Sequence, residues 1–215
     1  MIYYGEVKDF TYNEDNFSLV IDLGLSVKWA SLNIGASYPW EYGDYFAWGE
    51  TEAKSSYTFT NYKFNISGDS WDNVKYSKYN TSSSYGTVDN KITLDPEDDV
   101  AQVKWGYDWR MPTKAELEEL LNNCTWTWTI VNGVNGFNVT SNKSGYTNRS
   151  IFLPAAGDGN HIKKGDYCCY WSSSLSQDMS RPIPAADCLL GRWLDVCVRE
   201  IGQSVRPVCP LGLSE

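Results

Sequence analysis

Hydrophobic positions first gather in residues 19–35, LVIDLGLSVKWASLNIG, where apolar and β-branched residues surround a glycine-marked turn. This composition favours a strand, because β-branched and aromatic side chains pack well on a pleated sheet. Residues 38–50 are crowded with aromatic side chains, and Tyr42, Phe46 and Trp48 suit a packed core better than a surface. Residues 51–91 are polar without a sustained period. We therefore expect a long excursion of loops there, ordered in part by its tyrosines.

The segment LDPEDDVAQVKWG predicts a first helix. Asp95 can cap it, and Pro96 suits the first helical position because a proline lacks the N–H that would be unpaired there anyway. The acidic residues that follow complement the positive end of the helix dipole.

The segment MPTKAELEELLNNC predicts a second helix. Thr113 and Glu116 have the Thr-x-x-Glu spacing of a capping box. Leu117, Leu120 and Leu121 then fall on one helical face, which we expect to be buried.

The remainder of the chain indicates strands. TWTWTIVNGVNGFNVTS alternates polar and apolar residues and has Asn-Gly turn signals at 132–133 and 135–136, as a hairpin does. SIFLPAAG, YCCYWSSS and SVRPVCP have the composition of further short strands. The predicted fold class is α+β, with two early helices and a mostly antiparallel set of short strands joined by long loops.

Composition bounds the function. With 215 residues and 42% hydrophobic content, residues 1–215 are expected to form one domain with a substantial core. The net charge of −9 argues against nucleic acid as a partner, because phosphate-binding surfaces need clustered Lys and Arg. No run of 18 apolar residues predicts membrane insertion, and the N-terminal residues lack the pattern of a signal peptide.

Six cysteines are present, but their spacing matches no disulfide scaffold, so we interpret them mostly as free thiols. There is no Cys-x-x-Cys pair, and His161 is the sole histidine. A zinc site of the usual kind would therefore lack ligands, and neither a metal nor another cofactor is expected.

Seven ordered segments carry a resemblance to a known family: VIDLGLSVKWA, YGDYFAWGE, WRMPTKAELEELLNNCTWTW, NGVNGFNVTS, SIFLPAAG, YWSSS and GQSVRPV. Together they resemble the major paralogous domain of Bacteroidota and Fibrobacter, a branch of the C-type lectin-like fold. The resemblance covers residues 19–210. The same scaffold is similar to the variable proteins of diversity-generating retroelements, in which a reverse transcriptase rewrites codons at template adenines.

The resemblance implies a structure and a role. The first and last strands would pair, and a variable window over residues 176–201 would lie exposed before GQSVRPV. The function implied is non-enzymatic ligand binding in adhesion or host recognition, with a protein or cell-surface ligand as partner. A phage virion or bacterial cell surface is then the expected location, and the cytoplasm otherwise.

Family members are typically rich in Asn and Tyr in this window, and the present chain departs from that pattern. Asn occurs 16 times in residues 1–160 and never in residues 161–215. An Asn codon carries two adenines, so their randomisation removes Asn and yields residues such as Cys, Leu, Arg, Val and Asp. The stretch DCLLGRWLDVCVREI, residues 187–201, has the composition of that product.

The predicted ligand-binding positions lie in this stretch: Asp187, Cys188, Leu190, Gly191, Arg192, Leu194, Asp195, Val196, Cys197, Val198, Glu200 and Ile201. Trp193 cannot arise from an Asn codon and is interpreted as scaffold. Arg199 and Arg206 recur in the family motif, which indicates scaffold ion pairs or backbone hydrogen bonds. Alternatively, the alternation of Leu194, Val196 and Val198 fits the buried face of a strand.

An aromatic core is expected to hold the backbone fixed under this surface. Its predicted members are Trp29, Trp48, Trp105, Trp109 and Trp171.

Two other functions remain open. WRMPTKAELEEL resembles a segment of formylglycine-generating oxidases, whose chemistry needs a reactive cysteine pair, and Cys188 and Cys197 are the conceivable pair. A calcium-dependent sugar-binding lectin is the second, with DPEDD at residues 95–99 as its acidic segment, although the sugar-binding triplets of true C-type lectins are missing. A Ser-His-Asp hydrolase lacks a Gly-x-Ser-x-Gly turn.

Overall fold

The computed structural model describes residues 19–68, 73–106, 108–178 and 185–212. Its α-helices are α1 (Val100–Trp105) and α2 (Lys114–Asn123). Its strands are β1 (Val20–Ile21), β2 (Lys28–Ala30), β3 (Cys124–Val131), β4 (Val134–Ser141), β5 (Ser150–Pro154), β6 (Cys169–Leu175), β7 (Ala186–Leu190), β8 (Trp193–Cys197) and β9 (Val208–Cys209). Short 3-10 helices occur at Phe59–Asn61, Ser83–Tyr85 and Pro96–Asp98.

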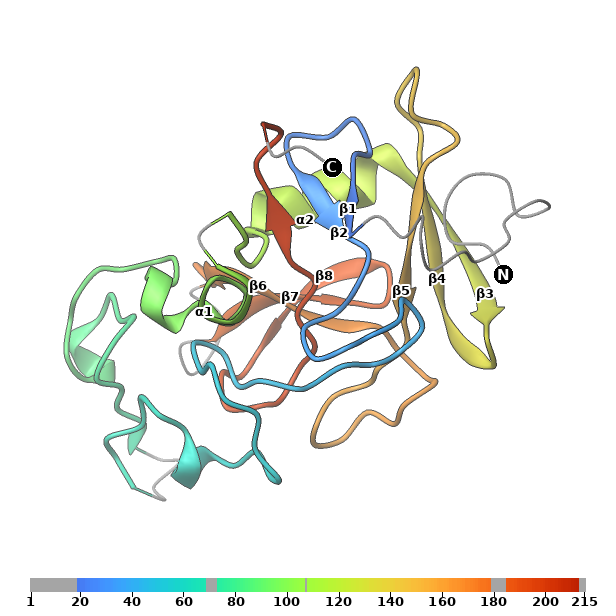
Figure 1. Cartoon of the computed structure of the whole chain (residues 1–215). Coiled ribbons are helices and arrows are strands. Elements are labelled where there is room, and N and C mark those ends of the chain that lie inside the picture. Colours follow the sequence, from blue (N-terminus) through green and yellow to red (C-terminus); the bar gives the residue numbers. More distant parts are fainter. Residues whose placement is uncertain (1–18, 69–72, 107, 179–184, 213–215) are drawn as a thin grey trace.

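These strands form three small antiparallel sheets, in the orders β1-β2-β9, β3-β4-β5 and β6-β7-β8 (Figure 1). The α+β class with few helices and short antiparallel strands is therefore confirmed. The C-type lectin-like fold itself stays a prediction.

The sheet β1-β2-β9 joins the two ends of the described chain. Lys28 of β2 pairs with Cys209 of β9, whereas β1 pairs only with β2. The segment predicted as one early strand, residues 19–35, thus contains two strands, and the second of them pairs with the last described strand. A buried arginine, Arg206, lies just before β9 and donates to the carbonyls of Ala30 and Phe152 at 3.0 and 2.9 Å.

The second helix begins as predicted. The Thr113 hydroxyl accepts from the Glu116 amide, and the Glu116 carboxylate accepts from the Thr113 amide, which satisfies two end groups of the helix. Leu117 and Leu120 are buried, and Leu121 packs against the same cluster.

The start of α1 differs from the prediction. Pro96 does lie at the first position of a 3-10 turn, but Asp95 makes no side-chain capping bond. Asp99 caps α1 instead, accepting from the amides of Ala101 and Gln102 at 2.9 and 3.3 Å. The Asp95 carboxylate instead forms ion pairs with Lys78 and Lys91.

The β3–β4 hairpin turns at one of its two Asn-Gly signals. Asn132 and Gly133 have φ values of 49° and 81°, the left-handed pair that a type I′ turn requires. Gly136 lies within β4, where a Cβ would approach Leu153 O to 2.3 Å.

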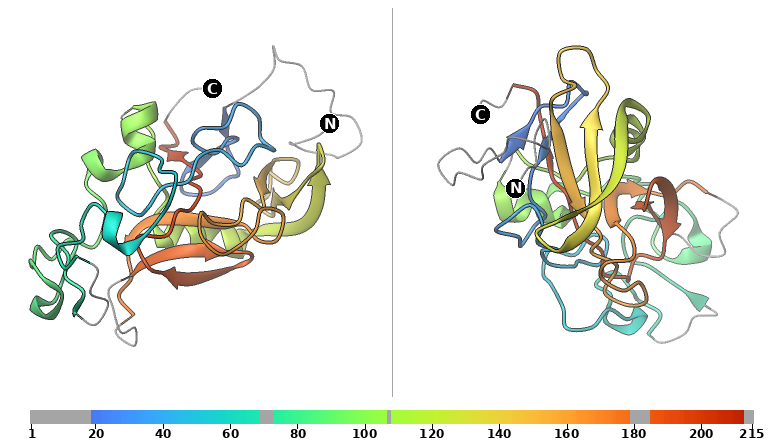
Figure 2. Two further views of the ribbon diagram at one scale, coloured as in Figure 1. Left: turned by 90° about the horizontal axis from the view of Figure 1, so that it is seen from below. Right: turned by 90° about the vertical axis from the view of Figure 1, so that its right-hand side faces the viewer.

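The sheet β6-β7-β8 lies between the two main hydrophobic clusters. One cluster contains Leu189 with the buried leucines of α2, and Figure 2 shows α2 running along that side of the sheet. The other contains Trp171 and Cys188 together with the aromatic residues of the early loops. The central strand β7 is therefore covered on both faces.

The predicted aromatic core is confirmed with one partial exception. Trp29, Trp48, Trp109 and Trp171 are buried, whereas Trp105 is half-buried and packs edge-to-face against Trp109.

The described parts of residues 51–91, which are residues 51–68 and 73–91, form the expected loop excursion, with short 3-10 helices within it. They extend away from the β3–β4 hairpin, at the opposite end of the molecule (Figures 1 and 2). Tyrosines order this excursion: Tyr62, Tyr76 and Tyr79 are buried in the aromatic cluster, and the Tyr62 hydroxyl donates to Trp48 O at 2.8 Å. Among the described residues, neither helix has the length and apolar content that crossing a bilayer would require.

Candidate functional site

The predicted surface is built on the hairpin of β7 and β8. Its strands pair from Leu190 with Trp193 to Ala186 with Cys197, and the two residues between them are Gly191 and Arg192. Gly191 has a φ of 63°, as the first position of a type II′ turn requires. Part of the predicted window, residues 179–184, lies outside the described residues.

The tip of this hairpin is its most exposed part. Arg192 is exposed, and Trp193 retains 49% of its surface. The Trp193 ring packs edge-to-face against Tyr167, which is 45% exposed. The interpretation of Trp193 as scaffold, a position that does not vary, stays a prediction, and its side chain lies exposed at the hairpin tip. An adjacent exposed Trp, Tyr and Arg is the residue combination most enriched at interface hot spots.

Strand β8 is the edge of its sheet, and the predicted positions on it, at the end of β7 and just after β8 are half-buried. These positions are Leu190, Leu194, Asp195, Val196, Cys197, Val198 and Ile201. Leu194 packs against the cluster beside α2, and Cys197 packs against the opposite cluster. The strand thus contributes to the core and also presents side-chain surface.

Four predicted contact residues are buried: Asp187, Cys188, Gly191 and Glu200. Asp187 and Cys188 belong to the covered central strand, so the prediction that they lie on an exposed surface is wrong. Asp187 instead pairs with Lys114 Nζ at 3.3 Å. Burial raises the pKa of Asp187, and the Lys114 charge opposes that shift.

The two arginines of the GQSVRPV region bind backbone, as predicted. Arg199 donates to Lys78 O and Tyr79 O at 3.3 and 2.7 Å, and its guanidinium lies 4.4 Å from the Tyr76 ring centroid. It therefore fastens the segment after β8 to the loop excursion.

Cys188 and Cys197 lie side by side on the hairpin. Cys197 pairs with Ala186, two residues from Cys188, so both thiols occupy the same face. Their hydrogen bond lowers the pKa of Cys197 against the effect of burial, and the same bond raises the pKa of Cys188. All six cysteines are free thiols, as predicted. Of this pair, Cys188 is fully buried and Cys197 is partly accessible.

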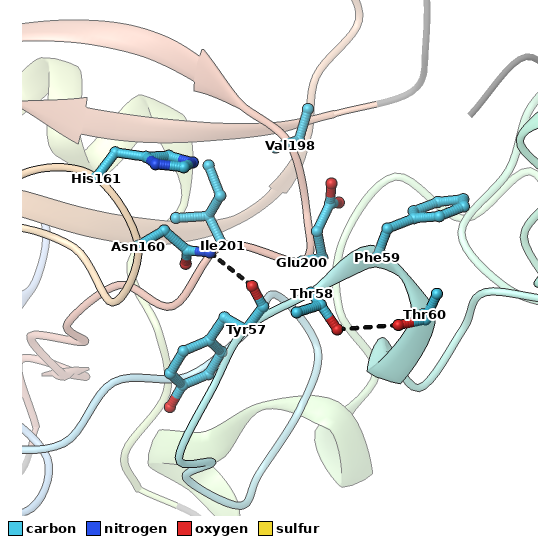
Figure 3. A pocket seen from close by; sticks show the side chains of 9 residues that line it. All are labelled: Tyr57, Thr58, Phe59, Thr60, Asn160, His161, Val198, Glu200 and Ile201. Carbon is cyan, nitrogen blue, oxygen red and sulfur yellow. Dashed lines mark hydrogen bonds between the residues drawn. The ribbon is translucent and has the colours of Figure 1, made fainter. Parts of the chain in front are cut away.

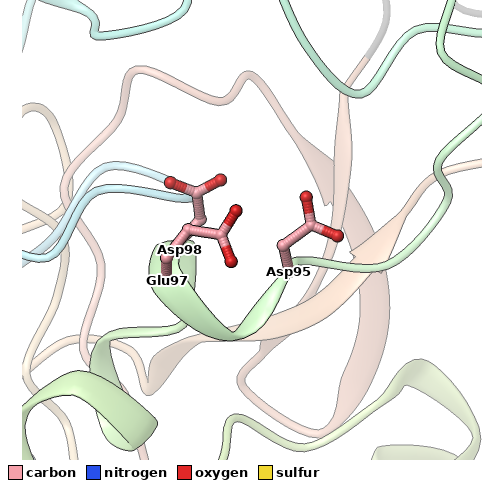
Figure 4. A group of neighbouring side chains, drawn as sticks. All are labelled: Asp95, Glu97 and Asp98. Carbon is pink, nitrogen blue, oxygen red and sulfur yellow. The ribbon is translucent and has the colours of Figure 1, made fainter.

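The acidic segment forms a cluster of Asp95, Glu97 and Asp98, whose carboxylate oxygens lie within 4.8 Å of one another (Figure 4). Lys78 Nζ contacts all three residues, at 2.6, 3.3 and 2.5 Å respectively. Lys63 adds a second contact to Asp98.

These lysines neutralise the acidic cluster. Hydrogen bonds from Lys78 and Lys91 lower the pKa of Asp95. A calcium ion would have to displace ammonium groups that already hold these oxygens, so this cluster gives the calcium-lectin alternative no ready site.

A pocket of about 340 Å³ adjoins the end of the predicted window (Figure 3). Its walls come from residues 57–60, 160–161, 198 and 200–201. The sole histidine, His161, lines it, as do Val198, Glu200 and Ile201 from the predicted surface.

Close backbone packing holds the pocket walls together. Gly202 and Gly159 flank the Tyr57 ring, and a Cβ on Gly202 would approach that ring to 2.6 Å. Asn160 donates to Tyr57 O at 2.6 Å and accepts from the Gly202 amide at 3.3 Å. Sequence reasoning missed Tyr57 and Asn160, because residues 51–91 carry no period and the contact joins segments far apart in sequence.

In comparisons with known proteins, no family model matches the chain, and no curated protein or solved structure matches it significantly.

Proposed function

We propose that the protein is a non-enzymatic, hypervariable ligand-binding protein with a C-type lectin-like fold, diversified by a retroelement and used in adhesion or host recognition. The observation that carries the proposal is the exposed tip of the β7–β8 hairpin, where Arg192 and Trp193 stand on a sheet with core on both sides. Such a platform presents anchor residues without depending on them for its fold.

The contrast between the exposed hairpin tip and the buried arginines that follow the hairpin supports this role. Changes at the exposed tip alter surface chemistry, whereas the buried neighbours Arg199 and Arg206 bind backbone carbonyls on other segments. A fixed backbone limits the conformational entropy lost when a ligand binds. The proposed variable positions are accordingly Arg192 at the tip and the half-buried positions on or beside β8, and not Trp193, Asp187 or Cys188.

The composition of the window adds independent support. Residues 161–215 contain no Asn, although the preceding part of the chain contains 16. Randomised adenines in Asn codons account for that absence, and also for cysteines that need no catalytic role.

The DNA beside the gene tests the proposal. The expected finding is a near-copy of the last few dozen codons in which Asn codons replace those of the variable positions, next to a reverse-transcriptase gene. If neither a near-copy nor a reverse-transcriptase gene is found, the retroelement origin is contradicted, and the protein is an ordinary surface domain.

An oxidase-like enzyme is the second candidate, favoured by the direct contact between Cys188 and Cys197. Such chemistry needs a thiolate that reaches a substrate. The pKa of Cys197 is lowered, so Cys197 is the thiol of the pair that forms a thiolate more readily. The reactivity of the Cys188 and Cys197 thiols at neutral pH distinguishes this candidate from the binding protein, because an oxidase of this kind has no mechanism if both thiols are inert.

A further inference from the structure

The pocket beside the hairpin is lined by a buried carboxylate that no other residue hydrogen-bonds. Glu200 is 3% exposed, and neither of its carboxylate oxygens accepts a hydrogen bond from another residue. Burying a charged group without a partner is unfavourable, because the lost hydration is not replaced. Figure 3 shows the carboxylate between the side chains of Val198 and Phe59.

The neighbouring cation does not satisfy this carboxylate. Arg199 directs its guanidinium to the carbonyls of Lys78 and Tyr79 instead. Burial raises the pKa of Glu200, and the Arg199 charge opposes that shift without removing it. The site therefore lacks a donor that a ligand could provide.

The rest of the pocket defines what kind of donor fits. Phe59, Val198 and Ile201 provide apolar walls, and the hydroxyls of Thr58 and Thr60 lie 3.1 Å from each other at its side. An anion is disfavoured by Glu200 and by the net charge of −9. A cationic head with a short aliphatic stem matches both the carboxylate and the walls.

We infer that this pocket binds an alkylguanidinium group, as carried by an arginine side chain of a protein ligand. Two carboxylate oxygens that accept no hydrogen bond from another residue match the parallel N–H donors of a guanidinium, which binds carboxylates in a bidentate manner. Both oxygens are covered, so binding requires the Glu200 side chain to rotate toward the pocket, a movement that would break no hydrogen bond to another residue. The inference rests on the proposed ligand-binding role, but it does not require that the segment varies.

The test is a titration of the full chain with n-butylguanidinium, followed through the methyl NMR signals of Val198 and Ile201. The n-butylguanidinium concentration is kept in the millimolar range so that the compound does not denature the protein. We expect saturable shifts in the unmodified protein and at least about tenfold weaker binding in Glu200→Gln, the loss expected when one charge-assisted contact is removed. The neutral isostere n-butylurea should give no saturable shift.

Glu118→Gln is the matched control, because it removes the same charge from an exposed position on α2. It should bind as the unmodified protein does. Thermal unfolding of Glu200→Gln checks that the fold persists, which we expect because the change removes a buried, unpartnered charge.

Three results would each overturn the inference: no saturable shift with n-butylguanidinium, equal binding of n-butylguanidinium by Glu200→Gln, or equal binding of n-butylurea. The peptide acetyl-Gly-Arg-Gly-amide then distinguishes the sources. Its saturable binding supports a protein side chain, whereas binding of n-butylguanidinium alone supports a free guanidinium compound and overturns the protein source. Either result leaves the DNA test of the proposed function untouched, so the two can fail separately.

Discussion

Trp193 packs edge-to-face against Tyr167, with ring centroids 6.3 Å apart and an interplanar angle of 74°, and both rings remain nearly half exposed. Gly191 lies beneath this pair, where a Cβ would come within 3.3 Å of the indole. The hairpin tip therefore holds two large rings in a defined orientation while leaving their outer surfaces free. Ordered aromatic surface of this kind loses little conformational entropy on binding.

Replacing Trp193 by Phe should change the free energy of unfolding by no more than about 0.5 kcal/mol, because the side chain is largely surface. The same replacement at Trp171 should cost about 2 kcal/mol or more, since that indole is buried and donates to Phe46 O at 2.8 Å. Urea unfolding measures the free energy of unfolding of both variants. Equal losses of stability in the two variants would contradict the separation of the surface residue Trp193 from the scaffold residue Trp171.

Arg206→Met should destabilise the protein by about 3 kcal/mol, because it leaves the buried acceptors Ala30 O, Phe152 O and Asn33 Oδ1 without this donor. Arg192→Met is the matched control at the exposed tip and should stay within about 0.5 kcal/mol. Thermal unfolding of the two variants provides the comparison. A large loss at Arg192 would show that the tip is structural.

Cys197 should react faster with a thiol reagent near neutral pH than Cys188 does, because the hydrogen bond from Cys188 lowers its pKa and its side chain is partly accessible. Burial raises the pKa of Cys124, Cys168 and Cys169, which should react slowly. Labelling followed by peptide mass spectrometry locates the modified residue. Cys197→Ser should remove most of the early labelling, and rapid labelling that persists in this variant would contradict the assignment.

The stability of the folded chain should fall in acid partly through Glu116. Burial raises the pKa of its carboxyl, but the bidentate hydrogen bonds from Arg110 prevail and hold the pKa below the usual 4.5. A depressed pKa stabilises the fold above the unfolded value, and this contribution is lost as pH falls through the folded value.

Glu116→Gln keeps acceptors for the capping box but removes the charge. The unmodified protein should therefore exceed the variant by about 1 kcal/mol at pH 7, a modest value because Arg110 is partly exposed. The difference should shrink as the pH falls below 4.5, the unshifted value. A difference that stays constant across this range would show that the ion pair contributes nothing.

Several local signals in the sequence predicted local structure correctly, although Asp95 does not cap a helix and Gly136 lies within β4. Thr113 and Glu116 form their capping box, and Asn132 with Gly133 makes the hairpin turn, because each of these features depends on residues a few positions apart. The early tryptophans were also identified as core, since large aromatic residues bury where a chain of this size folds.

Local sequence signals could not predict which residues of the predicted ligand-binding surface are buried. Asp187 and Arg192 are similar polar residues in sequence, yet one lies in a central strand and the other at a turn. The pocket was missed for a related reason: Glu200 meets Phe59 only because the loop excursion packs back onto the end of the window. Such contacts depend on tertiary packing and leave no periodic pattern.

Sequencing this gene across a population of its source tests the central claim most directly. The claim predicts that substitutions concentrate in the window, at the hairpin-tip residue Arg192 and at half-buried positions such as Val196 and Val198, while codons for Trp171 and Arg206 stay fixed. These substitutions should fall at positions where the template carries adenine. One invariant window sequence throughout the population, or substitutions spread evenly along the gene, would contradict the claim.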